Sequence, residues 1–258
     1  MADVFDIKSI IGFQEVNDMK KLLRHLLAEF IGTFLYIAIV LQTGTIGFAS
    51  RNNVGNGDDV DNVTIALANG LLVATIVQMI AHISGGHINP AVTIGSLVCG
   101  RIKLFKAVLY INMQIVGSII GAMVAYAVSS NVGRGNLAAT IPDPKLSAPE
   151  VFALELLQTF VLVATVLSTE RKNGPAGLGS APLAIGLSIT ACQICCVNYT
   201  GSLNPVRSFG PAVVMNIWIY HWVYWVAPIL GGSAAGLVYR YILTMDNEMI
   251  ALKLSNHD

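Results

Sequence analysis

Long apolar segments separated by short polar ones dominate the pattern of hydrophobic and polar positions along this chain. A helix that crosses a lipid bilayer needs about 20 mostly apolar residues, because its backbone must satisfy its own hydrogen bonds there. On this basis six segments are predicted to be membrane-spanning helices. They cover residues 22–48, 63–83, 104–128, 150–169, 182–197 and 221–243.

Two shorter apolar segments begin with the same dipeptide, Asn-Pro, at Asn89 and at Asn204. They cover residues 89–100 and 204–216, which is too short to cross a bilayer. Pro leaves no unsatisfied N–H in the first turn of a helix, and a preceding Asn can cap that turn. Each segment is therefore predicted to be a half-helix that enters the membrane without crossing it.

The chain contains two similar halves. Ala28–Phe34 resembles Leu154–Phe160, and each half has a Gly-Leu pair 18 or 19 residues before its Asn-Pro. With three spans in each half, the second half must be inverted relative to the first, as in many transport proteins. The predicted fold is all-α, with six spans and two half-helices. Its parts are an N-terminal segment 1–21, a membrane domain 22–244 (repeat one 22–128, repeat two 150–244) and a tail 245–258.

Charged residues indicate the orientation. When the six spans are threaded, eleven of the 15 Lys and Arg residues fall on the side of the N-terminus. Basic residues gather on the cytoplasmic side, so both termini are expected there, in a multi-pass protein of the plasma membrane. The net charge of zero, without a basic cluster, argues against a nucleic-acid partner. Without zinc-ligand spacing or a nucleophile–base arrangement, we expect no metal, no cofactor and no enzyme activity.

Glu29 and Glu155 occupy equivalent positions in the first span of each half. A carboxylate inside a membrane span is costly and implies a partner. We favour a structural role, in which each Glu accepts hydrogen bonds from the backbone N–H groups of an Asn-Pro loop. The alternative is a site that couples transport to protons or cations.

The Asn-Pro segments predict a narrow polar passage. Helix N-termini carry about half a positive charge, so two of them meeting from opposite faces create a positive potential at the membrane centre. The Asn amides can then donate hydrogen bonds into the passage, while the positive potential opposes cations. The expected central constriction is formed by Asn89, Pro90, Ala91, Asn204, Pro205 and Val206.

Over residues 20–245 the chain resembles the aquaporin, or major intrinsic protein, family. The motifs that carry the resemblance are Ala28-Glu29-Phe30, residues 84–93 with Asn89-Pro90-Ala91, Tyr110–Gln114, Tyr199-Thr200-Gly201, residues 204–212 and His221-Trp222. The resemblance implies a homotetramer in the lipid bilayer, with one water-conducting pore per subunit that excludes protons and ions. Ser208, Ala212 and the short loops resemble the water-selective branch more than the glycerol facilitators.

The chain departs from that branch at the outer constriction, or selectivity filter, of the pore. Alignment with the family places Asn69 where water-selective members have Phe, and Gln193 where they have His. Gly201 falls at the loop position and Arg207 is retained. A filter without the aromatic ring is expected to be wider or more polar, so urea or glycerol is a possible additional solute. By the same alignment the inner pore wall contains Tyr36, Val73, His87, Leu162 and Ile189.

Other functions stay open at this point. Within the family, the alternative is a channel mainly for glycerol or urea. Outside it, the alternatives are a coupled transporter or ion channel that uses Glu29 and Glu155, and a junctional structural protein. In the first outer loop, Asn62 of Asn62-Val63-Thr64 is a candidate glycosylation site.

Overall fold

The computed structural model describes Gly12 and residues 18–52, 62–129, 134–169, 179–196 and 201–243, with the side chains of 44–52 and 62 excepted. Most of the predicted N-terminal segment 1–21, the tail 245–258 and the glycosylation candidate at the Asn62 side chain lie outside this description. Every regular element within it is a helix, as the apolar pattern predicted.

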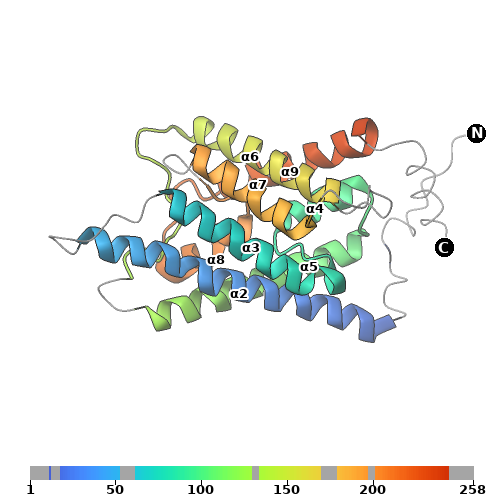
Figure 1. Ribbon diagram of the computed structural model, residues 1–258, viewed down its shortest axis with the longest axis horizontal. Coiled ribbons are helices and arrows are strands. Elements are labelled where there is room, and N and C mark those ends of the chain that lie inside the picture. Colours follow the sequence, from blue (N-terminus) through green and yellow to red (C-terminus); the bar gives the residue numbers. More distant parts are fainter. Residues whose placement is uncertain are drawn as a thin grey trace, which may run out of the picture.

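The helices follow the predicted segments closely (Figure 1). The last predicted span, 221–243, begins as an α-helix at Val223 and closes with a π-helical turn. In chain order the elements are α2 (Met19–Asn52), α3 (Asn62–Ser84), α4 (Pro90–Cys99), α5 (Leu104–Val128), α6 (Ala148–Thr169), α7 (Ala181–Cys196), α8 (Pro205–Met215), α9 (Val223–Val238) and η2 (Tyr239–Leu243).

Five of these elements are long and apolar enough to cross a membrane: α2, α3, α5, α6 and α9 with η2. The sixth predicted span is α7, which has 16 residues. At 1.5 Å per residue it is about 24 Å long, somewhat less than the roughly 30 Å hydrocarbon core. The described chain begins and ends at the same end of the bundle, where the first turn of α2 and η2 both lie (Figure 1).

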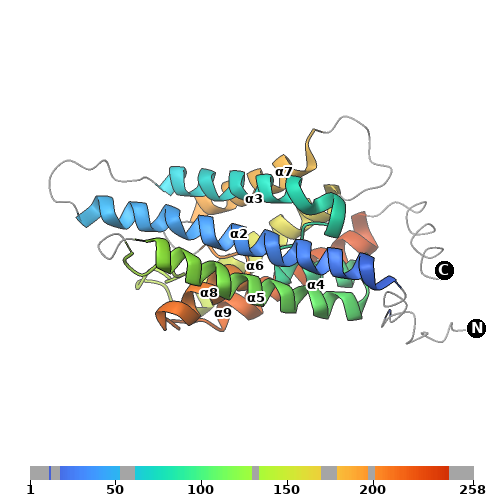
Figure 2. The same cartoon turned by 90° about the horizontal axis from the view of Figure 1, so that it is seen from below.

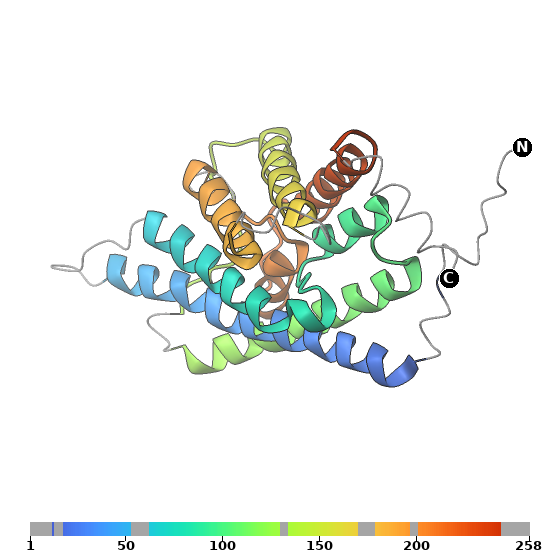
Figure 3. The same ribbon diagram turned by 45° about the vertical axis from the view of Figure 1, so that its right-hand side comes forward.

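The inverted repeat is visible in the packing. Helix α2 packs along α5 as α6 packs along α9, and α4 packs on α9 as α8 packs on α5. Helices α3 and α7 pack against each other along one side of the bundle, so that each half contributes one helix to this pair (Figure 2). The half-helices α4 and α8 lie among the longer helices (Figure 3). Each half-helix thus rests on the last span of the opposite half.

Glycines allow these close contacts. A Cβ atom at Gly117 would lie 2.8 Å from the Phe30 carbonyl oxygen, so α5 can approach α2 only without a side chain there. A Cβ at Gly232 would lie 2.5 Å from the Ala91 carbonyl oxygen, in the contact between α9 and α4. Small residues serve the same purpose in membrane helix pairs generally, because lipid gives helices little hydrophobic reason to associate.

Candidate pore

The two Asn-Pro turns meet in the interior and bond to each other. Asn89 Oδ1 accepts a hydrogen bond from the N–H of Ala91, and Asn204 Oδ1 accepts one from the N–H of Val206, so each side chain caps its own half-helix. Asn89 Nδ2 donates to the carbonyl oxygen of Leu203 at 2.9 Å, and Asn204 Nδ2 donates to that of Ile88 at 3.0 Å. Each amide therefore joins the loop of the other half.

The residue before each Asn has a left-handed backbone conformation. The φ angle is 44° at Ile88 and 54° at Leu203, and such a conformation costs a non-glycine residue about 1–3 kcal/mol. Both residues are held from two sides. Their carbonyls accept the Asn amides described above, and their N–H groups donate to Glu29 Oε2 at 2.7 Å and to Glu155 Oε2 at 2.9 Å, respectively. These four bonds offset the strain and fix where the carbonyls point.

The two glutamates are fully buried and bind the loops that precede the half-helices. Glu29 Oε1 also accepts hydrogen bonds from the Ser84 hydroxyl at 2.7 Å and the His87 N–H at 2.9 Å. Glu155 Oε1 accepts one from the Ser202 N–H at 2.8 Å. Carboxylates engaged in this way stabilise backbone donors that have no other secondary-structure partner. This geometry favours the structural role for Glu29 and Glu155 over proton coupling.

The loop between α3 and α4, which covers Gly85 to Asn89, is called the inner loop below. A polar cluster beside it includes Gln114, to which sequence reasoning assigned no role. Gln114 Nε2 donates to Glu29 Oε2 at 2.9 Å and to Thr93 Oγ1 at 3.0 Å. The Thr93 hydroxyl donates to the Asn89 carbonyl, so its oxygen must accept the 3.1 Å bond from His87 Nδ1. His87 Nδ1 is therefore the donor in this bond.

A cavity of about 240 Å³ begins at the inner loop and reaches the two Asn side chains. All five residues expected in the inner pore wall line it: Tyr36, Val73, His87, Leu162 and Ile189. Asn89 and Asn204 line it too, whereas Pro90, Ala91, Pro205 and Val206 are buried outside its lining. The cavity is thus an apolar passage that ends at two amides, with loop residues from Gly85 to Ile88 along one side.

The predicted filter residues lie outside this cavity, and three of them form one hydrogen-bonded chain. Asn69 Nδ2 on α3 donates to Gln193 Oε1 on α7 at 2.9 Å, and Gln193 Nε2 donates to the Gly201 carbonyl at 2.8 Å. Asn69 Oδ1 is buried, and no hydrogen-bond partner for it is present in the described structure.

Arg207 is positioned by a loop that sequence reasoning did not connect to the site. Its Nη1 donates to the Ala138 carbonyl at 2.8 Å and to Thr140 Oγ1 at 3.1 Å. Ser208 Oγ also donates to Thr140 Oγ1, at 2.7 Å. Gln114 stood inside a motif shared with the family and was therefore detectable. Ala138 and Thr140 carry no such signal, because only the folded loop brings them to α8.

Comparisons with known proteins agree on one family. Residues 16–239 match the family model described as major intrinsic protein. The chain is 44% identical over 223 residues to the lens fiber major intrinsic protein of Lithobates pipiens, covering 85% of this chain and 81% of that protein. It is 40% identical over 224 residues to aquaporin-1 of Sus scrofa, covering 85% and 82%.

A third relative, aquaporin-4 of Mus musculus, is 41% identical over 226 residues, which cover 86% of this chain and 68% of that protein. Among solved structures, the X-ray structure of the aquaglyceroporin from Plasmodium falciparum matches with a TM-score of 0.73 and 25% sequence identity. The match covers 90% of this chain and 99% of that one.

Proposed function

This chain belongs to the major intrinsic protein family, and from that premise we propose that it is a passive channel for water across a lipid bilayer. The observation that carries the proposal is the pair of crossed amides, Asn89 and Asn204, at the end of an apolar cavity. Similarity to aquaporin-1 and aquaporin-4 supports it. Members of this family act as channels rather than as enzymes.

The amides explain how water passes while protons do not. Each Nδ2 group has two hydrogens, and one of them is used in the bond to the opposite loop. The second hydrogen of Asn89 and of Asn204 can be donated to a water molecule in the cavity. A water that accepts both donors turns its own hydrogens outward, which interrupts a proton wire. The N-termini of α4 and α8 add positive potential at the same place, which opposes cations.

The filter residues support a broader version of this proposal, in which small neutral solutes pass through the channel as well as water. Asn69 and Gln193 bond to each other across α3 and α7, so two hydrogen-bonded amides occupy the positions at which the family resemblance expects Phe and His. Asn69 Oδ1 remains a buried acceptor, and the Arg207 guanidinium carries N–H donors. Such a constriction can bind a small neutral solute that both donates and accepts hydrogen bonds, of which urea is the smallest test case. Glycerol is the larger one.

The same reasoning extends to the assembly and its place in the cell. We propose a homotetramer with one pore per subunit, in the plasma membrane, with both termini in the cytoplasm. Apolar side chains exposed on the outer faces of the helices support contact with lipid or with other subunits. The excess of Lys and Arg at the end where the described chain begins and finishes supports the orientation.

Swelling of reconstituted vesicles in water, urea and glycerol gradients tests the proposal. Vesicles that contain the protein should swell faster than empty ones in an osmotic gradient, and equal rates would contradict a water channel. The Asn69→Phe/Gln193→His variant should lower the ratio of urea to water permeability. An unchanged ratio in this variant, with water flux intact, would overturn the filter assignment but not the channel.

A further inference from the structure

The two halves of the chain differ at one packing contact behind the pore. In the first half, Gly32 on α2 faces two isoleucines of α3. A Cβ atom at Gly32 would overlap Ile80 and would lie 3.3 Å from Ile76 Cγ2. The equivalent residue of the second half is Gln158 on α6, since each of the two lies three residues after the buried glutamate of its half. A residue without a side chain thus corresponds to one with a long polar side chain.

The two isoleucines correspond to cysteines in the second half. Helices α3 and α7 cross at Gly70 and Gly186, where a Cβ atom on either glycine would overlap the carbonyl oxygen of the other. This crossing fixes the equivalence of the two helices. The residues six and ten positions after Gly70 are the isoleucines, and those at the same distances after Gly186 are Cys192 and Cys196.

Gln158 is a buried side chain without a hydrogen-bond partner. It is 5% exposed, and neither Oε1 nor Nε2 has a hydrogen-bond partner in the described structure. Cys192 Sγ donates to the backbone carbonyl of Gln158 at 3.8 Å, so the two helices meet at this residue. By the repeat, the Gln158 side chain extends toward Cys192 and Cys196, which are smaller than isoleucine. A buried amide with both polar atoms unpaired is unfavourable, and a bound water or ion is its usual explanation.

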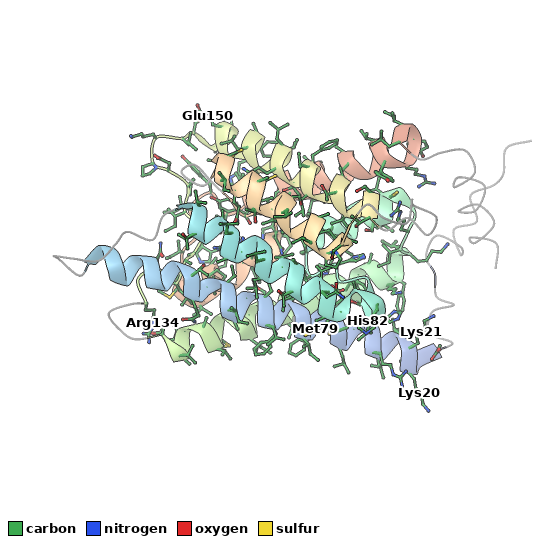
Figure 4. All side chains as sticks on the ribbon, in the orientation of Figure 1. Lys20, Lys21, Met79, His82, Arg134 and Glu150 are labelled. Atoms are coloured by element: carbon green, nitrogen blue, oxygen red, sulfur yellow. The ribbon has the colours of Figure 1, made fainter. Side chains whose placement is uncertain are left out.

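The two thiols are placed as a pair of ligands. Residues four apart on a helix lie on one face, with Cβ atoms about 5–6 Å apart. Both cysteines are partly exposed, and neither forms a disulfide bond. Cys196 is the last residue of α7, at the end of the bundle where Figure 4 labels Arg134 and Glu150. An ion can therefore reach the thiols from that end.

We propose that Cys192 and Cys196 bind one soft monovalent cation of the copper(I) class, and that Gln158 Nε2 donates a hydrogen bond to a ligating sulfur. Thiolate ligands select such ions. Within the described ranges no group of three or more His, Cys, Asp or Glu side chains could hold a metal ion. The pair therefore suits an ion that accepts two ligands better than zinc, which takes four.

The balance of charge explains the need for the amide. Binding forms two copper–sulfur bonds and releases both thiol protons, which leaves one net negative charge on the complex. The N–H of Gln158 stabilises that charge by donating to a sulfur, as partners of metal ligands commonly do. The orphaned amide of the empty site then has a function.

The ion would stabilise the part of α7 that carries a filter residue. Gln193 follows Cys192 directly, and it bonds to Asn69 and to the Gly201 carbonyl. Two ligands four residues apart span about one helical turn, so a bound ion holds this turn in its helical form. A ligand that binds the folded state stabilises it by mass action. Copper(I) should therefore raise the melting temperature of the protein.

The test titrates the purified full chain in detergent with copper(I), under anaerobic conditions, in competition with the chromophoric chelator bicinchoninate. The wild-type protein should bind one ion per chain. Cys192→Ser and Cys196→Ser should each weaken binding about a hundredfold or more, and Gln158→Leu about tenfold, since partners of metal ligands contribute about 10–100-fold. Cys195→Ser and Cys99→Ser are the matched controls and should change the affinity less than about twofold.

Alkylation by iodoacetamide, located by mass spectrometry, gives a second readout. Bound copper(I) should protect Cys192 and Cys196 and leave the exposed Cys195 reactive. Equal protection of all three, or of none, would overturn the proposal. So would a loss of affinity in Cys195→Ser as large as in Cys192→Ser, or an unchanged affinity in Gln158→Leu. Without the ion, Gln158→Leu should melt no lower than the wild type, because its amide has no partner to lose. That result separates weaker binding from a failure to fold.

Discussion

The two Asn-Pro turns share a scaffold but differ in what surrounds them. In both, a buried Glu binds the loop N–H groups, a left-handed residue precedes the Asn, and the Asn amide crosses to the other half. The turn at Asn89 is the inner one and the turn at Asn204 the outer one. The inner turn is supported by helix side chains, chiefly Gln114 and Thr93. The outer turn is supported by a loop, through Ala138 and Thr140.

This difference separates two tasks of the pore. The scaffold fixes the amides that are proposed to exclude protons, and it is repeated because both half-helices need it. The residues around the two turns are free to differ. On the inner side they form the open cavity, and on the outer side they form hydrogen bonds with one another. Solute selection is therefore expected to depend on the outer half, and the predictions below test that division.

The largest expected effect comes from the glutamates. Glu29→Ala and Glu155→Ala each leave two backbone N–H groups without their carboxylate acceptor in the interior. Each should destabilise the protein by about 3 kcal/mol or more. Thermal melting in detergent measures the loss, with Glu150→Ala on the exposed end of α6 as the control. A large loss from only one of the two would show that the halves do not share the scaffold.

The second effect concerns the residue after each Asn-Pro, which is Ala91 in α4 and Val206 in α8, both fully buried. Val206→Ala removes two methyl groups and should cost about 2 kcal/mol. Because neither residue lines the cavity, water permeability per folded protein should stay within about twofold of the wild type. Stopped-flow swelling of vesicles measures it. A severalfold rise in permeability would place Val206 in the pore instead.

A smaller effect is expected at the loop that supports Arg207. Thr140→Val keeps the shape of the side chain but removes the oxygen that Arg207 and Ser208 contact. It should cost about 1–2 kcal/mol and should alter the ratio of urea to water permeability, since Arg207 keeps only its bond to Ala138. Thr75→Val, on an exposed face of α3, is the control. Identical ratios in both variants would remove the loop from solute selection.

The smallest effect is a pH dependence on the outer side. His221 lies in the connection from α8 to α9, among Phe209, Trp218 and Trp225. Burial lowers the pKa of His221 from its usual value of 6.5, so the unfolded state takes up the proton more readily. Stability is then complete above that value and is lost as the pH falls through the lowered pKa. The melting temperature should fall slightly on acidification, and His221→Phe should flatten this response. A steeper response in that variant would contradict the assignment.

Much of the fold was readable from the sequence. The helix bounds differ from the predicted segments by only a few residues. The reason is that the length of an apolar segment, and the Asn-Pro dipeptide that starts a half-helix, are local features of the sequence. The equivalence of Glu29 and Glu155 was visible as a repeat. Five residues that line the cavity were named from the family resemblance, namely Tyr36, Val73, His87, Leu162 and Ile189. Their functional roles stay predictions.

What the sequence by itself determined is therefore a membrane-embedded, all-helical chain with two half-helices in inverted halves, because hydrophobic length and backbone satisfaction leave no other arrangement. The tertiary structure decided how the polar groups are used. That Asn69 binds Gln193, that Asn89 binds the Leu203 carbonyl, and that Thr140 holds Arg207 are contacts between residues 67 to 124 positions apart. Such pairings depend on how helices from the two halves pack, and no local pattern encodes them.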